Sequence, residues 1–165
     1  MHNSLGERFQ TFFLSLWAGG QLTVGYLVAP VLFASLPDDR ALAGMLAGKM
    51  FSIIAWVGLV LALVLVVVYY LQQKSKSFAQ WRFWSLAGLF VLSIVSLFVL
   101  QPMMAELKAQ GIVAGSEIAK QFGKLHGISS GLYLLGSLLL ASLVLAGLKT
   151  QAKTPRKRTT VGDRV

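Results

Sequence analysis

The chain has 165 residues, of which 56% are hydrophobic and only 13% are charged, whereas soluble domains carry roughly 25% charged residues. This composition excludes an ordinary water-soluble domain, and the absence of cysteine excludes disulfides, thiolate metal sites and cysteine nucleophiles. The formal net charge of +9 does not indicate nucleic-acid binding, because the Lys and Arg residues flank apolar runs and fill a short tail, as in membrane proteins.

Four uncharged stretches predict four membrane-spanning helices, at residues 11–35, 50–71, 83–104 and 125–148. Each is longer than the roughly 20 residues needed to cross a hydrocarbon core. A backbone in lipid must satisfy its own hydrogen bonds, so each stretch is predicted to be α-helical. The predicted fold class is therefore all-α, a four-helix transmembrane bundle that forms one domain of residues 1–148. The polar, basic tail at residues 149–165 is predicted to be disordered.

The first span has polar residues and a proline with structural consequences. Gln21 and Thr23 are the polar residues nearest its middle, and interhelical hydrogen bonds are predicted for both. Pro30 lacks a backbone donor and frees the carbonyl of Tyr26, so a kink is predicted there. After this span, Asp38 is predicted to cap the second helix.

Small residues recur at four-residue spacing before the second and fourth spans. Gly44 and Gly48 precede the second span, and Gly123, Gly127 and Gly131 lead into the fourth. Such stripes let helix backbones approach closely in lipid. We predict that they pack helices together within the chain, and homo-oligomerisation is the alternative.

The third span ends in a second proline, followed by a glycine-containing turn. Pro102 frees the carbonyl of Phe98, and a kink is predicted there too. Gly111 and Gly115 are predicted to break the chain, and Ser116 to start the fourth helix before it enters the bilayer.

The distribution of basic residues predicts the orientation. With the N-terminus inside, ten of the 15 Lys and Arg residues lie on the cytoplasmic side, as the positive-inside rule requires. The five on the outer side are diluted by acidic residues. We therefore predict a multi-pass protein of the bacterial cytoplasmic (inner) membrane, surrounded by lipid, with both termini in the cytoplasm.

Five polar residues fall together in the outer half of this predicted bundle: Lys49, Gln101, His126, Ser129 and Ser130. His126 shares a helical stripe with the two serines, and ionisable side chains at membrane depth often mark a functional site. These residues are the candidate functional positions. The alternative is that His126 bonds to a carbonyl freed by a proline and has no function.

The segment FGKLHGISSGLYLLGSLLLASLVLAGL, residues 122–148, resembles the last helix of the transmembrane protein 205-like family of small four-helix membrane proteins. Other elements agree in order: W-x-G and LF-x-SLP in the first helix, GKMF at the second, and QP closing the third. The resemblance implies these motif positions: His126, Gly127, Ser129 and Ser130, with Lys49, Phe51 and Pro102 in supporting motifs. The loop after Pro102 is shorter than in animal relatives. Because animal members are associated with platinum-drug tolerance and secretory traffic, the resemblance implies a role in export or membrane homeostasis.

Three functions remain open on these observations. The first is a non-enzymatic membrane protein of small-solute export or envelope homeostasis, since the spans contain no carboxylate and no Ser–His–Asp set. The second is a haem or copper protein, which requires His126 to pair with Met103 or Met104, or with a second copy. The third is a scaffold or accessory subunit that packs against another membrane protein. The prediction is the first function, without a catalytic residue, metal or cofactor.

Overall fold

The computed structural model describes residues 4–152, without the side chains of residues 4, 5, 7, 73, 75, 76, 78 and 150–152. Every regular element in this part of the chain is helical. In order, the elements are α1 (Ser4–Thr23), the π-helical turn η1 (Val24–Val28), α2 (Ala29–Ser35), α3 (Arg40–Gln73), the 3-10 turn η2 (Lys74–Ala79), α4 (Trp81–Val95), the π-helical turn η3 (Ser96–Leu100), α5 (Gln101–Ala109) and α6 (Glu117–Ala152).

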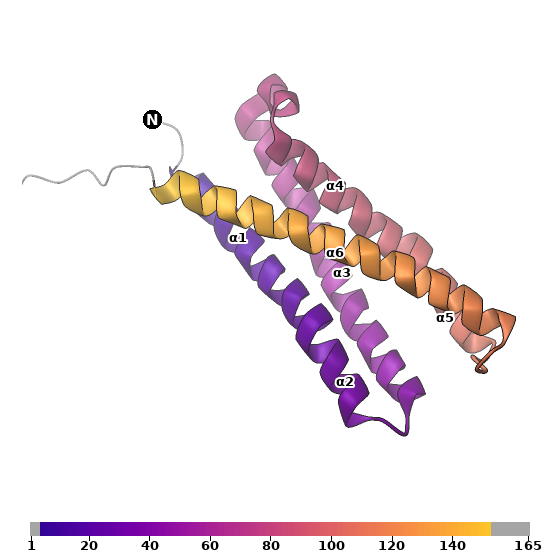
Figure 1. The fold of residues 1–165 in the computed structure, drawn as a ribbon. Coiled ribbons are helices and arrows are strands. Elements are labelled where there is room, and N and C mark those ends of the chain that lie inside the picture. The colour runs from indigo at the N-terminus through magenta and orange to yellow at the C-terminus, as the bar shows by residue number, and fades with distance from the viewer. Residues whose placement is uncertain (1–3, 153–165) are drawn as a thin grey trace, which may run out of the picture.

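Four continuous helical rods result: α1 with η1 and α2, then α3, then α4 with η3 and α5, and finally α6 (Figure 1). By length and composition, all four are able to span a membrane, which confirms the predicted four-helix, all-α class and indicates a multi-pass membrane protein. α1 packs mainly against α6, and α3 packs mainly against α4; the first rod as a whole also lies along α3, through α1, η1 and α2.

The core of the bundle lies where these two pairs meet. Trp17 is 3% exposed, and its indole covers Gly58 so closely that a Cβ there would lie closer than 3.0 Å to the ring. Leu140 of α6 is fully buried, and Leu89 of α4 lies in the same cluster. Large apolar side chains such as Leu138 point outward instead, as expected of a surface that faces lipid.

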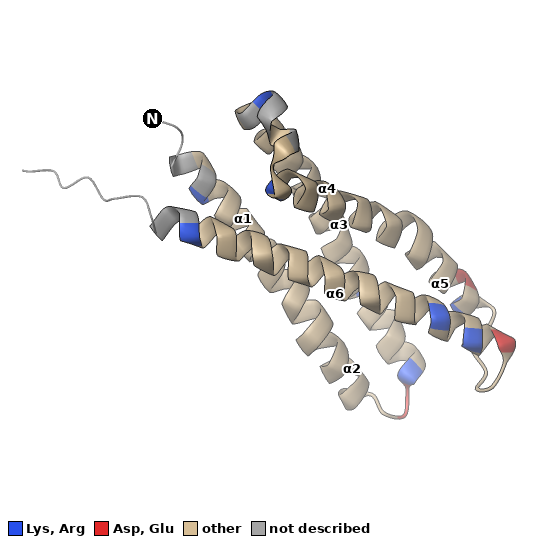
Figure 2. Cartoon of the chain, turned by 45° about the horizontal axis from the view of Figure 1, so that its top comes forward, with Lys and Arg blue, Asp and Glu red and all other residues tan. Residues whose placement is uncertain are grey.

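Charged side chains gather at the two ends of the bundle and leave its middle uncharged (Figure 2). At the end where α1 begins and α6 finishes, the described charged side chains are all basic: Arg8, Lys74, Arg82 and Lys149. We call this the basic end. The opposite end carries both signs, and we call it the mixed-charge end; it includes Asp39, Arg40, Glu106, Lys108, Glu117 and Lys120.

Three predicted helix boundaries can be compared with the structure. The cap of α3 is Asp39, whose carboxylate accepts from the backbone N–H of Leu42 at 2.9 Å; the prediction of Asp38 was wrong by one residue. Gly111 and Gly115 have φ values of +82° and +81°, which favour glycine, and they break the chain as predicted. At the other limit, α6 continues through Ala152, past the predicted start of the tail. Residues 153–165 of that tail lie outside the described residues.

Both predicted kink sites coincide with π-helical turns. The turn η1 ends two residues before Pro30, and the backbone N–H of Ala29 bonds to the carbonyl of Val24. The turn η3 ends two residues before Pro102 and is closed in the same way, from Gln101 to Ser96. Prolines remove a donor from a helix, and a π-turn is one way to redistribute the remaining bonds.

The glycine stripe of α6 does not pack within the chain, which corrects the prediction of intramolecular packing. A Cβ at Gly123, Gly127 or Gly131 would meet nothing within 4 Å. The stripe is therefore on the outside of the bundle. On α3, Gly44 and Gly48 do face other elements, at ordinary contact distances of 3.8 Å from Phe33 and 3.6 Å from Lys108.

Candidate functional site

The first and last rods are joined deep in the bundle by a polar contact. The Gln21 amide donates to Ser137 Oγ at 3.1 Å and to the carbonyl of Tyr133 at 3.4 Å. In return, the Tyr133 hydroxyl donates to the backbone carbonyl of Gln21. The predicted interhelical bonding of Gln21 is thus confirmed. Thr23 is exposed, and its side chain forms no hydrogen bond to another described residue.

This polar contact depends on a glycine in the first π-turn. A Cβ at Gly25 would lie closer than 3.0 Å to the ring of Tyr133, so only glycine leaves room for the tyrosine. The rings of Phe51 and Tyr26 also pack on Tyr133, with centroids 5.1 Å and 6.2 Å away. The bonds between Gln21 and α6 join two helices, and Ser137 also donates to the carbonyl of Tyr133 in its own helix, so the cluster has a structural use.

His126 lies elsewhere, on the exposed side of α6 near the mixed-charge end. Its ring stacks on Phe122, one helical turn earlier, with centroids 6.0 Å apart and an angle of 13° between the rings. Lys108 of α5 places its ammonium 5.6 Å from the centre of the same Phe122 ring and donates to the carbonyl of Gly44 at 3.1 Å. Phe122 therefore connects His126 to a contact among α3, α5 and α6. Sequence reasoning missed Lys108, although the small residues Gly44 and Gly48 mark the place that receives it.

The other candidate residues do not converge with His126 on one enclosed site. Ser130 and Lys49 are exposed, and Ser129 and Gln101 are half-buried. None of the five side chains forms a hydrogen bond to another described residue, so the expected bond from His126 to the carbonyl of Phe98 is not formed. His126 and Ser130 both lie on the outer surface of α6. They alternate there with the glycines that have open space around them, which we call the open glycines: Gly123, Gly127 and Gly131.

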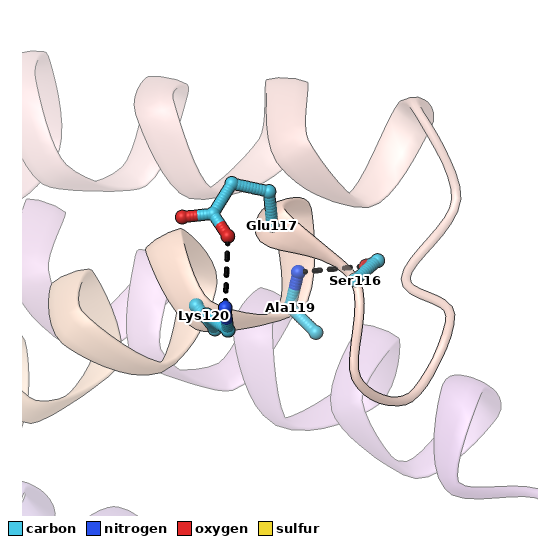
Figure 3. A network of polar contacts seen from close by, with 4 residues as sticks. All are labelled: Ser116, Glu117, Ala119 and Lys120. Atoms are coloured by element: carbon cyan, nitrogen blue, oxygen red, sulfur yellow. Dashed lines mark hydrogen bonds and ion pairs between the residues drawn. The ribbon is translucent and has the colours of Figure 1, made fainter.

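The outer surface of α6 begins at the first turn of that helix, which is held by two local contacts (Figure 3). Ser116 Oγ accepts from the backbone N–H of Ala119 at 3.1 Å, which confirms the predicted helix start. Glu117 pairs with Lys120 at 3.0 Å, and the acidic residue lies in the first turn, where the helix dipole favours it. The part of the chain that the structure describes contains no group of three His, Cys, Asp or Glu side chains able to hold a metal ion.

A family model, described as a domain of unknown function (DUF4149), matches residues 12–113, more than half of the chain. The chain belongs to the DUF4149 family. In this DUF4149 protein the match runs from α1 into the loop after α5, so it contains Lys49, Gln101 and Lys108. It leaves out α6, which carries His126 and the open glycines. Neither the curated proteins nor the solved structures gave a match to the chain.

Proposed function

We propose that this DUF4149 protein is a non-enzymatic protein of the bacterial cytoplasmic membrane, resembling the transmembrane protein 205-like family, in small-solute export or envelope homeostasis. The observation that carries the proposal is the direction of its motif residues. His126 and Ser130 are exposed on α6 between glycines that have open space around them. Catalytic groups converge in a pocket, whereas an outward polar and small-residue face suits contact with a solute or a second membrane protein.

Helix-packing physics favours such a contact. Polar side chains are expensive in lipid unless they meet a partner, and small residues allow another helix to approach closely. The face formed by Gly123, His126, Gly127, Ser130 and Gly131 offers both features, which also favours the alternative role of an accessory subunit. The haem alternative has no comparable support, and a Soret band in the purified protein would be needed to revive it.

Complementation tests this role of the α6 face. A deletion strain is screened for sensitivity to toxic solutes and envelope stress, and variants are then returned to it. His126→Ala and Gly127→Leu are expected to be present at normal levels in the membrane but to fail in complementation. Ser142→Ala is the matched control, because Ser142 is exposed on the same helix and its hydroxyl donates to the carbonyl of Leu139 within that helix. Full complementation by both variants would remove the α6 face from the function.

The proposed orientation, with both termini in the cytoplasm, has its own test. It is supported by the basic end, where Arg8, Lys74, Arg82 and Lys149 meet the preference for positive charge inside. A reporter fused after Leu148 is expected to report cytoplasm, and one inserted at Gly111 to report the outside. An active alkaline phosphatase fusion after Leu148 would reverse the orientation.

A further inference from the structure

A small cleft lies at the basic end, where all four rods meet. Polar groups from Gln10 and Thr11 of α1, Tyr69 of α3 and Arg82 of α4 line it, and the rest of its lining is three leucines and a glycine: Leu14, Leu86, Leu143 and Gly147. The cavity volume is about 20 Å³, which is room for about one water molecule. A single oxygen atom of a larger group fits this space while the rest of the group stays outside.

The walls of the cleft are held in place by contacts within the bundle. The Gln10 amide donates to Gln72 Oε1 at 3.1 Å, and the Tyr69 hydroxyl donates to Gln80 Oε1. Thr11 packs against Gly147 so closely that a Cβ there would lie closer than 3.0 Å to its side chain. The cleft is therefore preformed, and a ligand does not have to order these side chains on binding.

Arg82 gives the cleft a positive charge. Arg82 is half-buried, and among the described side chains it has no ion-pair partner. The ion pair that these side chains form, between Glu117 and Lys120, lies at the opposite end of the bundle. A guanidinium binds phosphate or carboxylate oxygens through two parallel hydrogen bonds. Partial burial favours such a partner because a cation is poorly solvated there.

Arg82 lies at the end of a membrane-spanning rod, where lipid headgroups are the nearest anions. Trp81 and Trp84 flank it at the start of α4 and are 53% and 60% exposed, and tryptophans at the ends of membrane-spanning helices are enriched at the level of the headgroups. Arg8 near the start of α1 and Lys149 near the end of α6 lie at the same end and add to the positive potential. Basic pockets between membrane-spanning helices at this level suit anionic headgroups.

We propose that this cleft binds the phosphate group of an anionic phospholipid. Arg82 holds two phosphate oxygens, one oxygen enters the cavity beside Gln10, and the acyl chains lie along the apolar surface of the bundle. The lipid thereby bridges α1 and α4 at the basic end.

The test uses the full chain purified in a neutral detergent. Its thermal unfolding midpoint is measured with phosphatidylglycerol, cardiolipin or phosphatidylcholine, and with inorganic phosphate. The two anionic lipids are expected to raise the midpoint, and phosphatidylcholine and free phosphate are not. Arg82→Gln should weaken the apparent affinity for anionic lipid about tenfold or more, from the loss of charged hydrogen bonds. Lys149→Gln, an equal charge change outside the cleft, should leave the affinity within about twofold.

Arg82→Lys keeps the charge and loses the two-bond geometry, so it is expected to fall between wild type and Arg82→Gln. It also serves if Arg82→Gln is unstable without lipid. Equal lipid effects in wild type and both Arg82 variants would overturn the proposal. So would an equal loss in Lys149→Gln, which would indicate general electrostatic attraction, or an equal rise with inorganic phosphate, which would indicate a free-phosphate site.

Discussion

The two halves of the chain are helical hairpins built on one plan. In each, a π-helical turn interrupts the first rod and ends two residues before a proline, Pro30 in one and Pro102 in the other. Four pairs of buried residues in these two rods recur at the spacing that separates the prolines: Thr11 and Phe83, Leu14 and Leu86, Trp17 and Leu89, and Gln21 and Ser93. The second rod of each hairpin carries a Gly-Lys pair near the mixed-charge end, at residues 48–49 and 123–124. The repeated positions are those that build the scaffold.

The hairpins differ in the residues that come after the Gly-Lys pair. At the third, sixth and seventh residues after the glycine, the first hairpin has Phe51, Ile54 and Ala55. The second hairpin has His126, Ser129 and Ser130 at the same places. These positions are apolar and half-buried in the first hairpin, whereas in the second they are polar and two of them are exposed. This departure from the common plan supports a specialised role for the α6 face.

Substitution of a glycine is expected to give the largest difference in unfolding free energy between the two hairpins. Gly25→Leu forces a side chain into the space of Tyr133, and overpacking costs about 1–3 kcal/mol or more. Gly127→Leu enters open space and should change the unfolding free energy by less than about 0.5 kcal/mol. Reversible unfolding in detergent micelles measures both. Equal destabilisation by the two variants would mean that the α6 stripe packs within the bundle after all.

Substitutions at the corresponding polar residues Gln21 and Ser93 should differ less in their effect on the unfolding free energy. Gln21 bonds across to α6, whereas Ser93 donates to the carbonyl of Leu89 in its own helix at 2.9 Å. Gln21→Leu should cost about 0.6–1.7 kcal/mol, the range of interhelical hydrogen bonds in membranes. Ser93→Ala should be nearly neutral. A double-mutant cycle of Gln21→Leu with Ser137→Ala isolates the bond, and zero coupling would show that it contributes no stability.

Substitution of the two prolines is expected to change the unfolding free energy least, and by similar amounts in the two hairpins. Pro30→Ala and Pro102→Ala restore a backbone donor but add freedom to the unfolded chain, and these terms oppose each other. Each variant should therefore shift the unfolding free energy by less than about 1 kcal/mol, in the same direction, as unfolding midpoints can show. Shifts of opposite sign would argue that the two π-turns are not equivalent.

The sequence was sufficient for the spans and most of their ends, because hydropathy, caps and glycine turns act locally. It placed Gln21 in a helix interface but did not identify Ser137, since the partner depends on how two rods cross. The direction of the α6 stripe was wrong for a related reason. Four-residue spacing puts Gly123, Gly127 and Gly131 on one face of α6. Whether that face points into the bundle depends on where the large side chains of the other helices pack. The rings of Tyr133 and Trp17 pack on Gly25 and Gly58 instead, and neither of these glycines belongs to a run of glycines at four-residue spacing. The cleft at Arg82 also escaped prediction, because its walls come from four separate elements.

The pairing of α1 with α6 joins the first and the last helices of the chain to be synthesised. α3 and α4 are neighbours in the chain and can pair as soon as both have entered the membrane. α1 enters first but meets its main partner only after α6 has been translated and inserted. Until then the Gln21 amide lies in lipid without Ser137. A chain that stops before α6 can still pack its first rod along α3, but it leaves the Gln21 amide without its partner in α6.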